Sequence, residues 1–502
     1  MYWFGIGIDP LLNYLDRRLS GIPVTSLPVA GPTPEGAAGH ALPPLQQHYR
    51  VVAYADDVKP AITCMQEFQL VDHACSLLER ASGVKLHRDP SAGKVKFLPL
   101  GRWKGNLTQE DLPHQYVQLS DHLDFVGVEL RATFQQTRKV NGDQLQERVK
   151  NTVGPWKAGR FMPLTLRPFS ANTYALSKVW FKCSSVNLRI QDIDTINRQV
   201  KSWLYQDCFE KPSELVLYRD TQAGGLGLFH VRIRSLALLI SSFLETASNP
   251  KFRHSLLHEV LFRYHVLGET CLPNPGFLPY YDQNFFNTIK HYQDTCPLNI
   301  SLMTTKQWYR VLLEDRVLMH PGADVATPVL LPVRVEQLVP EQDWPATWSL
   351  SKTKGLSSEQ TAFIFKLLHQ LLPTQDRLNR ITNEPSLCKI CHAATEDLYH
   401  ALFTCTSSRS TADMLLSYVH IVAPGLSPQK LLRLDFGEGL EKSDELATLC
   451  LISTSLKYIW QARADKKTVT QYKMRAEVEA VISILRKTRF SASADRLLEI
   501  VI

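Results

Sequence analysis

The 502-residue sequence contains no apolar run that approaches the roughly 18 residues needed to cross a membrane as a helix. It also lacks a basic region ahead of its short N-terminal apolar stretch, so a secretory signal peptide is not expected. Without a secretory signal, the ten cysteines are expected to be thiols and metal ligands and not a disulfide framework. These absences predict an intracellular protein, nuclear or cytoplasmic, with no membrane partner.

The glycine-rich run Gly224–Gly227 lacks two features of a phosphate-binding loop. It has neither the Gly-Lys-Ser/Thr ending nor the preceding apolar strand of that motif, so we interpret it as a tight turn. No internal repeat is present in the chain either, which excludes a solenoid architecture.

What the chain does contain is the composition of a globular protein, with 44% apolar and 21% charged residues. Its length gives room for two to four domains. The net charge of +7 is unevenly placed, because residues 138–234 hold 16 Lys and Arg against 8 Asp and Glu, an excess of eight positive charges. Such a local excess is typical of a phosphate-backbone binder, although a solvated basic face explains it equally well.

The most informative stretch is Tyr54-Ala55-Asp56-Asp57. A β-branched and aromatic run precedes it, and Lys59-Pro60 ends the residues that follow, which predicts a tight β-hairpin with an acidic tip. Adjacent strand residues face opposite ways, so Asp56 and Asp57 can share a metal only if the backbone turns between them. Carboxylates suit a pair of Mg²⁺ ions about 3.5–4 Å apart that assist in-line phosphoryl transfer. The alternative is an exposed Asp-Asp turn without a metal.

The segments after this hairpin follow a specific order. Helical spacing of apolar residues predicts a helix over residues 62–80, which Ser82-Gly83 ends because glycine adopts the left-handed conformation there. Strands are predicted at Val84-Lys85-Leu86 and over residues 95–101. This order resembles the palm of the reverse transcriptases of LINE-type (non-LTR) retrotransposons. Residues 121–128 resemble the family's next motif, which implies a second hairpin lying near the primer terminus.

The resemblance implies roles for particular residues. Asp56 and Asp57 would be the catalytic Mg²⁺ ligands, and Tyr54 would line the site near the primer end. By a looser resemblance, Lys94 or Lys96 would lie near the departing pyrophosphate.

The family takes one more metal-binding Asp from a strand upstream of the acidic hairpin. Residues 1–19 resemble the helix between those two strands, and Asp9 within them does not match the missing ligand. We therefore expect a separate chain or an upstream segment to supply it, and no polymerase activity from this chain alone. No endonuclease signature is present.

A predicted helical block from Gln144 to about Glu245 resembles the thumb of the same family. Trp156–Leu164 and Asn172–Leu176 carry this resemblance, and core packing is the better interpretation for most of the block's Trp and Phe residues. The resemblance implies that the basic residues between them contact phosphates of a duplex without reading its sequence. These residues are Lys150, Lys157, Arg160, Arg167, Lys178 and Lys182.

A second constellation has the spacing Cys-x2-Cys-x8-His-x4-Cys, formed by Cys388, Cys391, His400 and Cys405. A Cys-x2-Cys turn can point both thiolates at one ion, and a predicted helix over residues 397–404 carries the other two ligands. The set predicts a closed tetrahedral Cys₃His site for a structural Zn²⁺ ion.

Two alternatives to this ligand set remain. His392 is a rival ligand, but it follows Cys391 directly and would crowd the same turn; the other alternative is three unrelated thiols near a histidine. Similar knuckles lie downstream of the polymerase in LINE-type proteins, after a Leu-Pro-Thr…Arg-Leu stretch that Leu371–Leu378 resembles.

The remaining chain is predicted in coarser terms. A loop is expected over residues 21–45, a linker over 332–348, a helix from Ser357 until Pro373, and amphipathic helices over 446–460 and 470–485 that pack against the knuckle region. We predict an α+β fold with four domains. They are a partial polymerase palm with an antiparallel sheet (1–130), a basic helical thumb (131–245), a helical connector that includes residues 308–313 (246–356) and a helical C-terminal domain with the zinc knuckle at 388–405 (357–502).

Three functions are compatible with these features. The leading hypothesis is a fragment of a non-LTR retrotransposon reverse transcriptase, with an RNA template and a DNA primer or target as partners and two-metal nucleotidyl transfer in the complete enzyme. The alternative is a catalytically inactive nucleic-acid-binding remnant. The third is a zinc-stabilised scaffold with no nucleic-acid role.

Overall fold

The computed structural model describes residues 11–25, 46–54, 57–83, 88–92, 94–155, 162–206, 211–248, 283–296, 299–314, 334–436, 440 and 442–501. The chain forms two compact units, each discontinuous along the sequence. The first unit comprises residues 1–148, 178–196 and 231–325, and the second comprises residues 149–177, 197–230 and 326–502.

The described residues are mostly helical, with short sheets confined to the first unit, so the predicted α+β class with a helical C-terminal region is confirmed. The four predicted domains stay a prediction, because compact units need not fold independently. Within the described residues, no helix is both long and apolar enough to span a membrane.

The strands of the first unit pair two by two. Three pairs are antiparallel (β1 with β2, β3 with β4, β7 with β8), and β5 pairs with β6 in parallel. Their bounds are β1 (Ile22–Thr25), β2 (Gln46–Tyr49), β3 (Val51–Tyr54), β4 (Asp57–Pro60), β5 (Val95–Phe97), β6 (Val117–Leu119), β7 (His122–Phe125) and β8 (Val128–Arg131).

The predicted loop over residues 21–45 is wrong at its start, where β1 lies. Its partner β2 begins more than twenty residues later in the sequence, so the pairing depends on a contact that local composition does not reveal. Val84-Lys85-Leu86, a predicted strand, lies outside the described residues, and the predicted strand at 95–101 is confirmed in the shorter form of β5.

The two predicted hairpins are present as paired strands. In the first, Tyr54 of β3 lies opposite Asp57 of β4, so Ala55 and Asp56 are the two residues that connect them. In the second, Val126 and Gly127 connect β7 and β8 with φ angles of 48° and 75°. Two successive left-handed residues are typical of a type I′ turn, whose twist matches that of antiparallel strands.

Helix α2 (Glu67–Ser82) confirms the predicted helix after the first hairpin. Gly83 ends it with φ 73°, and its amide donates to the Glu79 carbonyl at 2.9 Å. At the other end the buried Glu67 carboxylate accepts the amide protons of Ser20 and Thr63, both at 2.6 Å. Glu67 therefore ties the segment before β1 to the segment after β4.

The helices of the first unit bury a core between α9 and α12. Trp308 and Leu312 of α12 are fully buried against Ile240 of α9, which confirms the helix predicted around Trp308. The elements that lie wholly or partly in this unit are α3 (Phe134–Val153), α6 (Ser177–Ser185), α7 (Ile190–Leu204), α9 (Val231–Ser248), α11 (Gln283–Thr295) and α12 (Thr305–Glu314), with 3₁₀ turns η1 (Pro90–Ala92), η2 (Gly101–Trp103), η3 (Gln109–Asp111) and η8 (Ile300–Leu302).

The second unit contains helices and, within its described residues, two isolated β-bridges, Lys354 with Leu356 and Leu387 with Thr395. Its elements are α5 (Arg167–Ser170), η4 (Ala171–Leu176), α8 (Glu214–Tyr218), η5 (Thr221–Ala223), α14 (Arg334–Leu338), α15 (Trp344–Leu350), α16 (Ser358–Leu368), α17 (Gln375–Thr382), η9 (His400–Thr404), α18 (Arg409–Val422), α19 (Pro428–Leu432), α20 (Lys442–Ala464), α21 (Gln471–Arg486) and α22 (Ser491–Val501).

Residues 332–348, predicted to be a linker, instead contain α14 and the start of α15. Pro345 lies in the first turn of α15, where a missing amide proton costs nothing, and Asp343 caps that turn by accepting from the Ala346 amide. Pro345 therefore marks a helix start and not an extended connection.

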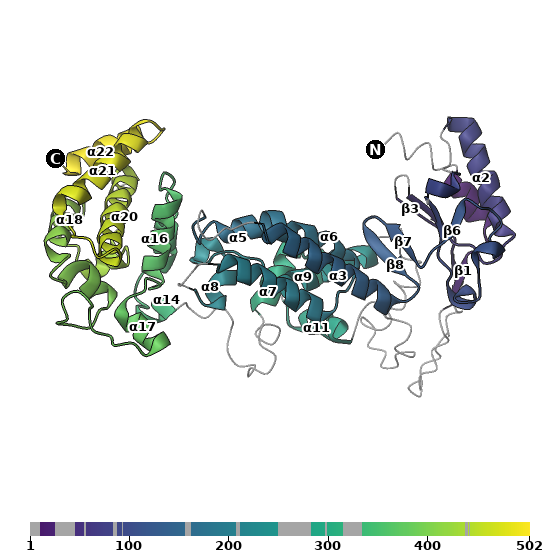
Figure 1. The fold of residues 1–502 in the computed structure, drawn as a ribbon, viewed down its shortest axis with the longest axis horizontal. Coiled ribbons are helices and arrows are strands. Elements are labelled where there is room, and N and C mark those ends of the chain that lie inside the picture. Colours follow the sequence, from purple (N-terminus) through teal and green to yellow (C-terminus); the bar gives the residue numbers. More distant parts are fainter. Residues whose placement is uncertain are drawn as a thin grey trace. The chain divides into compact units, whose positions relative to one another are not determined.

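Helix α20 packs against α16, α18, α21 and α22 in the C-terminal bundle (Figure 1). Its residues from Leu446 to Leu456 are buried on every side, so α20 is the central helix and not an amphipathic one as predicted. Helix α21 is amphipathic, with Met474, Val478, Ile482 and Leu485 buried at helical spacing.

Candidate functional site

The four predicted zinc ligands lie together in the second unit. One ligand atom from each of Cys388, Cys391, His400 and Cys405 falls within 4.8 Å of all the others. The Sγ atoms of Cys388 and Cys405 are 3.8 Å apart, and Cys391 Sγ is 3.3 Å from His400 Nε2. A tetrahedral zinc ion with Zn–S bonds of about 2.3 Å separates its sulfurs by about 3.8 Å. The residues therefore fit zinc, and all four tetrahedral positions come from the protein.

The second ligand pair, His400 and Cys405, lies on the same side of a locally widened helix. Residues five apart in a regular α-helix are turned by about 140° around the axis, which would point them apart. Element η9 is a π-type turn, and the Cys405 amide donates to the His400 carbonyl at 2.9 Å in an i to i+5 bond. The wider turn lets two residues at this spacing face the same ion.

The first ligand pair lies in a tight turn whose own backbone closes it. The His392 amide donates to the Cys388 carbonyl at 3.0 Å, and the Ile390 amide donates to Cys388 Sγ at 3.4 Å. His392 is exposed and does not belong to the four-residue group, so His400 is the histidine that the structure brings to the cysteines.

The thiols have a buried cation beside them. Arg463 of α20 is 6% exposed, and its guanidinium donates to Cys388 Sγ at 3.5 Å and to the Ser407 hydroxyl at 3.0 Å. Ser407 in turn donates to Cys405 Sγ at 3.5 Å. Burial raises the pKa of Cys405, but the hydrogen bonds from Ser407 and Arg463 outweigh it and lower the pKa to about 6. At Cys405 this environment favours the thiolate, which is the form that binds metal, whereas burial raises the pKa of Cys388.

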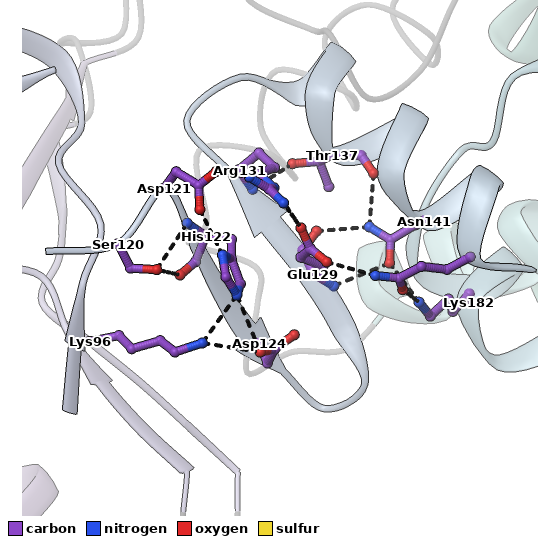
Figure 2. Close-up of polar contacts among 11 residues, drawn as sticks. Lys96, Ser120, Asp121, His122, Asp124, Glu129, Arg131, Thr137, Asn141 and Lys182 are labelled. Atoms are coloured by element: carbon purple, nitrogen blue, oxygen red, sulfur yellow. Dashed lines mark hydrogen bonds and ion pairs between the residues drawn. The ribbon is translucent and has the colours of Figure 1, made fainter. Parts of the chain in front are cut away.

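The second predicted hairpin, β7–β8, is fastened to helix α3 in the first unit (Figure 2). Among the residues that the structure describes, no further strand pairs with the outer edge of β8, and α3 side chains bond to that edge instead. Asn141 accepts from the Glu129 amide at 3.1 Å and donates to the Glu129 carbonyl at 2.8 Å, and Thr137 accepts from the Arg131 amide at 2.9 Å. Side chains one helical turn apart thus satisfy an edge strand that would otherwise be open to pairing.

Lys182 of α6 completes this network from the other side. It is 3% exposed, and its ammonium donates to Asn141 at 2.8 Å and to Gln144 at 2.6 Å, as Figure 2 shows for Asn141. Burial lowers the pKa of Lys182 to about 8, with the charge of Arg148 adding to the effect. The residue fixes the hairpin to the helices.

Two of the six basic residues predicted to contact nucleic acid are therefore internal. Besides Lys182, Arg167 is 3% exposed, and its guanidinium donates to the carbonyls of Met162, Leu204 and Gln206. A side chain held in this way presents no charge to a phosphate. The missed signal is periodicity, since Arg167 and Lys182 share a helix face with the buried Ala171, Ala175 and Val179.

Of the other basic residues, Lys150 and Lys178 are exposed, while Lys157 and Arg160 lie outside the described residues. Asp56 lies outside them too, and the strands place only the backbone of Tyr54 and Asp57. Lys96 is in contact with the β7–β8 hairpin, where its ammonium lies 3.1 Å from His122 Nε2 and 3.6 Å from Asp124 (Figure 2).

The glycine-rich turn at Gly224–Gly227 contacts helix residues of the second unit. Trp348 covers Gly224 so closely that a Cβ there would lie 2.4 Å from the indole ring. His369 stacks on Trp348 at 4.9 Å and donates through Nε2 to the Gly224 carbonyl at 2.7 Å. The amides of Gly225 and Gly227 bond to the carbonyls of Asp220 and Arg219. These amides are used internally, which agrees with a turn and not a phosphate loop.

Comparison with known proteins gives one match for this region. The sequence model of a family described as zinc-binding in reverse transcriptase matches residues 336–411, which contain all four ligands. No curated protein matches the chain. The match makes the C-terminal region reverse transcriptase-related, and together with the ligand geometry it supports a structural zinc ion.

Proposed function

We propose that this chain is the C-terminal part of a non-LTR retrotransposon reverse transcriptase, with part of the palm, the thumb and the zinc knuckle. The observation that carries the proposal is the Cys₃His cluster inside the segment that matches the zinc-binding region of reverse transcriptases. A closed site of this kind holds its surroundings in place and leaves no position for a substrate. The knuckle is then a folding centre, and any chemistry belongs elsewhere in the chain.

The proposal assigns that chemistry to the first hairpin. Its support is the pairing of Tyr54 with Asp57, which leaves two residues of sequence between the strands and places Asp57 at the start of β4. In the complete enzyme, Asp56 and Asp57 would hold Mg²⁺ for two-metal nucleotidyl transfer, with Tyr54 near the primer end. The family's further Asp ligand would come from a separate chain or an upstream segment.

The proposed partners are an RNA template and a DNA primer or target. Among the predicted contacts, the exposed Lys150 and Lys178 are retained, and Lys157 and Arg160 are proposed from sequence. Each would neutralise a phosphate, so binding should weaken as salt rises. Arg167 and Lys182 are left out, because both are buried and bonded to protein atoms.

A catalytically inactive nucleic-acid-binding remnant is the second candidate. It is favoured by one observation, that the acidic pair at the hairpin supplies only part of the family's metal-ligand set. Binding through the thumb does not need those ligands, so it would survive their absence.

Two assays on the full chain test the proposal. The first is primer extension on poly(rA)/oligo(dT) with Mg²⁺ or Mn²⁺, comparing wild type with Asp56→Ala and with the loop control Asp89→Ala. If wild type and Asp89→Ala extend the primer and Asp56→Ala does not, the inactive-remnant alternative is refuted. No extension from this chain alone, with salt-sensitive binding retained, is expected under both candidates, so extension is the outcome that separates them.

The second assay is fluorescence anisotropy with an RNA–DNA hybrid over a salt series. The combined variant Lys150→Ala, Lys157→Ala, Arg160→Ala and Lys178→Ala should bind more weakly, with its salt slope reduced by about one for each phosphate that is no longer neutralised. The matched control replaces the exposed Lys306 and Lys473 by Ala and should bind like wild type. Equal binding by both variants would reject these four residues as the nucleic-acid contacts, and no binding by wild type would overturn the nucleic-acid role and leave a zinc-stabilised scaffold.

A further inference from the structure

We propose that Arg463, which lies outside the matched segment 336–411, completes the zinc centre as a positioning residue and couples metal binding to the packing of helix α20. The inference concerns the metal centre alone and does not depend on the nucleic-acid role. It starts from the contacts of one buried guanidinium.

Arg463 reaches the sulfurs of Cys388 and Cys405, which lie 3.8 Å apart. It donates directly to Cys388 Sγ at 3.5 Å, and it reaches Cys405 through Ser407, whose hydroxyl lies 3.0 Å from the guanidinium and 3.5 Å from Cys405 Sγ. These two sulfurs come from opposite ends of the knuckle sequence, one in the Cys-x2-Cys turn and one at the end of η9. The Arg463 side chain therefore bridges the Cys-x2-Cys turn and the end of η9, and so holds Cys388 and Cys405 at their distance.

The guanidinium is itself held in position by a buried carboxylate. Glu396 accepts from Arg463 at 3.0 Å, and the two side chains are 9% and 4% exposed. Glu396 lies between the Cys-x2-Cys turn and η9, and its own amide donates to the Ser386 carbonyl at 2.9 Å. Only a planar fork with several fixed donors can serve Cys388, Ser407 and Glu396 at once, which is a property of arginine and not of lysine.

Charge gives a second reason for a cation at this place. Three thiolates and one neutral imidazole around a divalent ion leave one net negative charge in a buried site. An unbalanced buried charge is costly, and hydrogen bonds to ligand atoms are the usual means by which a protein orients them. Arg463 offers the hydrogen bonds, and its positive charge lies between the metal centre and the Glu396 carboxylate, two negative groups that would otherwise repel each other. Because it extends from the last turns of α20, loading of the metal and packing of that helix are linked.

The test uses the full chain loaded with zinc. Zinc transfer to the chromophoric chelator 4-(2-pyridylazo)resorcinol measures affinity, and the absorption of the cobalt(II)-substituted protein reports ligand geometry. Arg463→Met should raise the apparent zinc dissociation constant about 10- to 100-fold and shift the cobalt bands, with Arg463→Lys in between. The matched control on the same helix is Lys457→Met, which loses only a surface ion pair with Glu359 and should match wild type.

Wild-type zinc affinity and an unchanged cobalt spectrum in a folded Arg463→Met variant would overturn the inference. If Arg463→Met does not fold by circular dichroism, Ser407→Ala replaces it, since this change keeps both buried charges and removes the bridge to Cys405. Ser407→Ala should then weaken zinc binding several-fold, and wild-type affinity in both Ser407→Ala and Arg463→Lys would reject the proposal. A wild-type chain that takes up no zinc would overturn the zinc centre and this inference together, whereas loss of nucleic-acid binding alone would affect only the proposed function.

Discussion

His400 and His392 differ in exposure, in distance to the cysteines and in backbone conformation. His400 is 9% exposed, its Nε2 lies 3.3 Å from Cys391 Sγ, and its Nδ1 lies 3.3 Å from the Thr404 hydroxyl, which fixes the ring. His392 is exposed and has φ 52°, in the left-handed region that favours glycine. The two residues are thus a matched pair for assigning the fourth ligand.

We expect His400→Gln to weaken zinc binding by at least about 100-fold, because one of four ligands is lost. His392→Gly should keep wild-type zinc affinity and remain within about 1 kcal/mol of wild-type stability, since the strained φ is relieved while the unfolded chain gains freedom. Chelator titration and chemical denaturation of both variants check this. If His392→Gly loses zinc, His392 is a ligand and the assignment of the fourth ligand to His400 is wrong.

Single residues also show where sequence reasoning succeeds and where it stops. The zinc ligands could be predicted because their spacing alone restricts the chemistry. The role of Arg463 could not be predicted, because the sequence does not indicate which groups a single arginine contacts. Its position on the buried side of α20, after Leu456 and Ile459, indicates only that it is internal. Arg167 and Lys182 were assigned to the surface by charge, and helical periodicity would have placed them inside.

At the scale of elements, the glycine-rich turn is held from two directions in the second unit. Asn172 of η4 donates to the Gly227 carbonyl at 2.8 Å and accepts from the Phe229 amide at 3.0 Å. From the other side, Trp348 and His369 cover Gly224, and Trp348 donates to Glu336, which pairs with Arg219. The turn is thereby clamped between segments distant in sequence.

Asn172→Ala should destabilise the protein by about 2–3 kcal/mol, because it leaves a backbone carbonyl and a backbone amide without their partner. The neighbouring Thr173→Ala is the control, since Thr173 is exposed and its loss should cost less than about 0.5 kcal/mol. Chemical denaturation followed by circular dichroism measures both. Equal stability of the two variants would show that the clamp contributes nothing.

The contact of His369 with the glycine-rich turn makes the stability of the protein depend on pH. Burial lowers the pKa of His369 to about 4, and its hydrogen bond to the Gly224 carbonyl opposes this only in part. Above pH 6.5 both folded and unfolded states hold a neutral imidazole, so stability is complete. As pH falls from about 6.5 to about 4, only the unfolded state gains the proton, and up to about 3 kcal/mol is lost.

His369→Gln should therefore show a smaller fall in unfolding free energy between pH 7.5 and pH 5 than wild type does. His392→Gln is the control for an exposed histidine and should keep the wild-type slope. Acid acts on the zinc ligands in all three proteins alike, so the difference between slopes is the quantity to measure. Identical slopes in wild type and His369→Gln would contradict the role given to His369.

The sequence predicts well those helices whose start or end is determined by their own capping residues. Gly83 ends α2, and Ser357 with Gln360 forms the capping box that begins α16. Strand β1 and helix α14 depend instead on remote partners, β2 in one case and Arg219 in the other. Local patterns contain no information on such partners, which is why both segments were assigned to loops.

At the scale of the whole molecule, zinc should stabilise one unit and not the other. The four ligands, Glu396 and Arg463 all belong to the second unit, while the α9–α12 core belongs to the first. Removal of zinc by a chelator should increase hydrogen exchange over residues 386–411 and the last turns of α20, and leave α9 and α12 unchanged. Equal loss of protection in α9 and α12 would mean that the two units unfold together.

The π-type turn from His400 to Thr404 has a consequence for how this chain can vary. One residue removed between His400 and Cys405 would give the i, i+4 spacing that a regular helix places on one face, so the ligands could stay together only if the π-type turn were lost with that residue. An insertion in this short interval should separate the two ligands, whereas between Cys391 and His400 an insertion should be tolerated best at the exposed His392 and Ala393, away from the buried Glu396. A pattern search that assumes a regular helix, with three residues between histidine and cysteine, would pass over centres of this design.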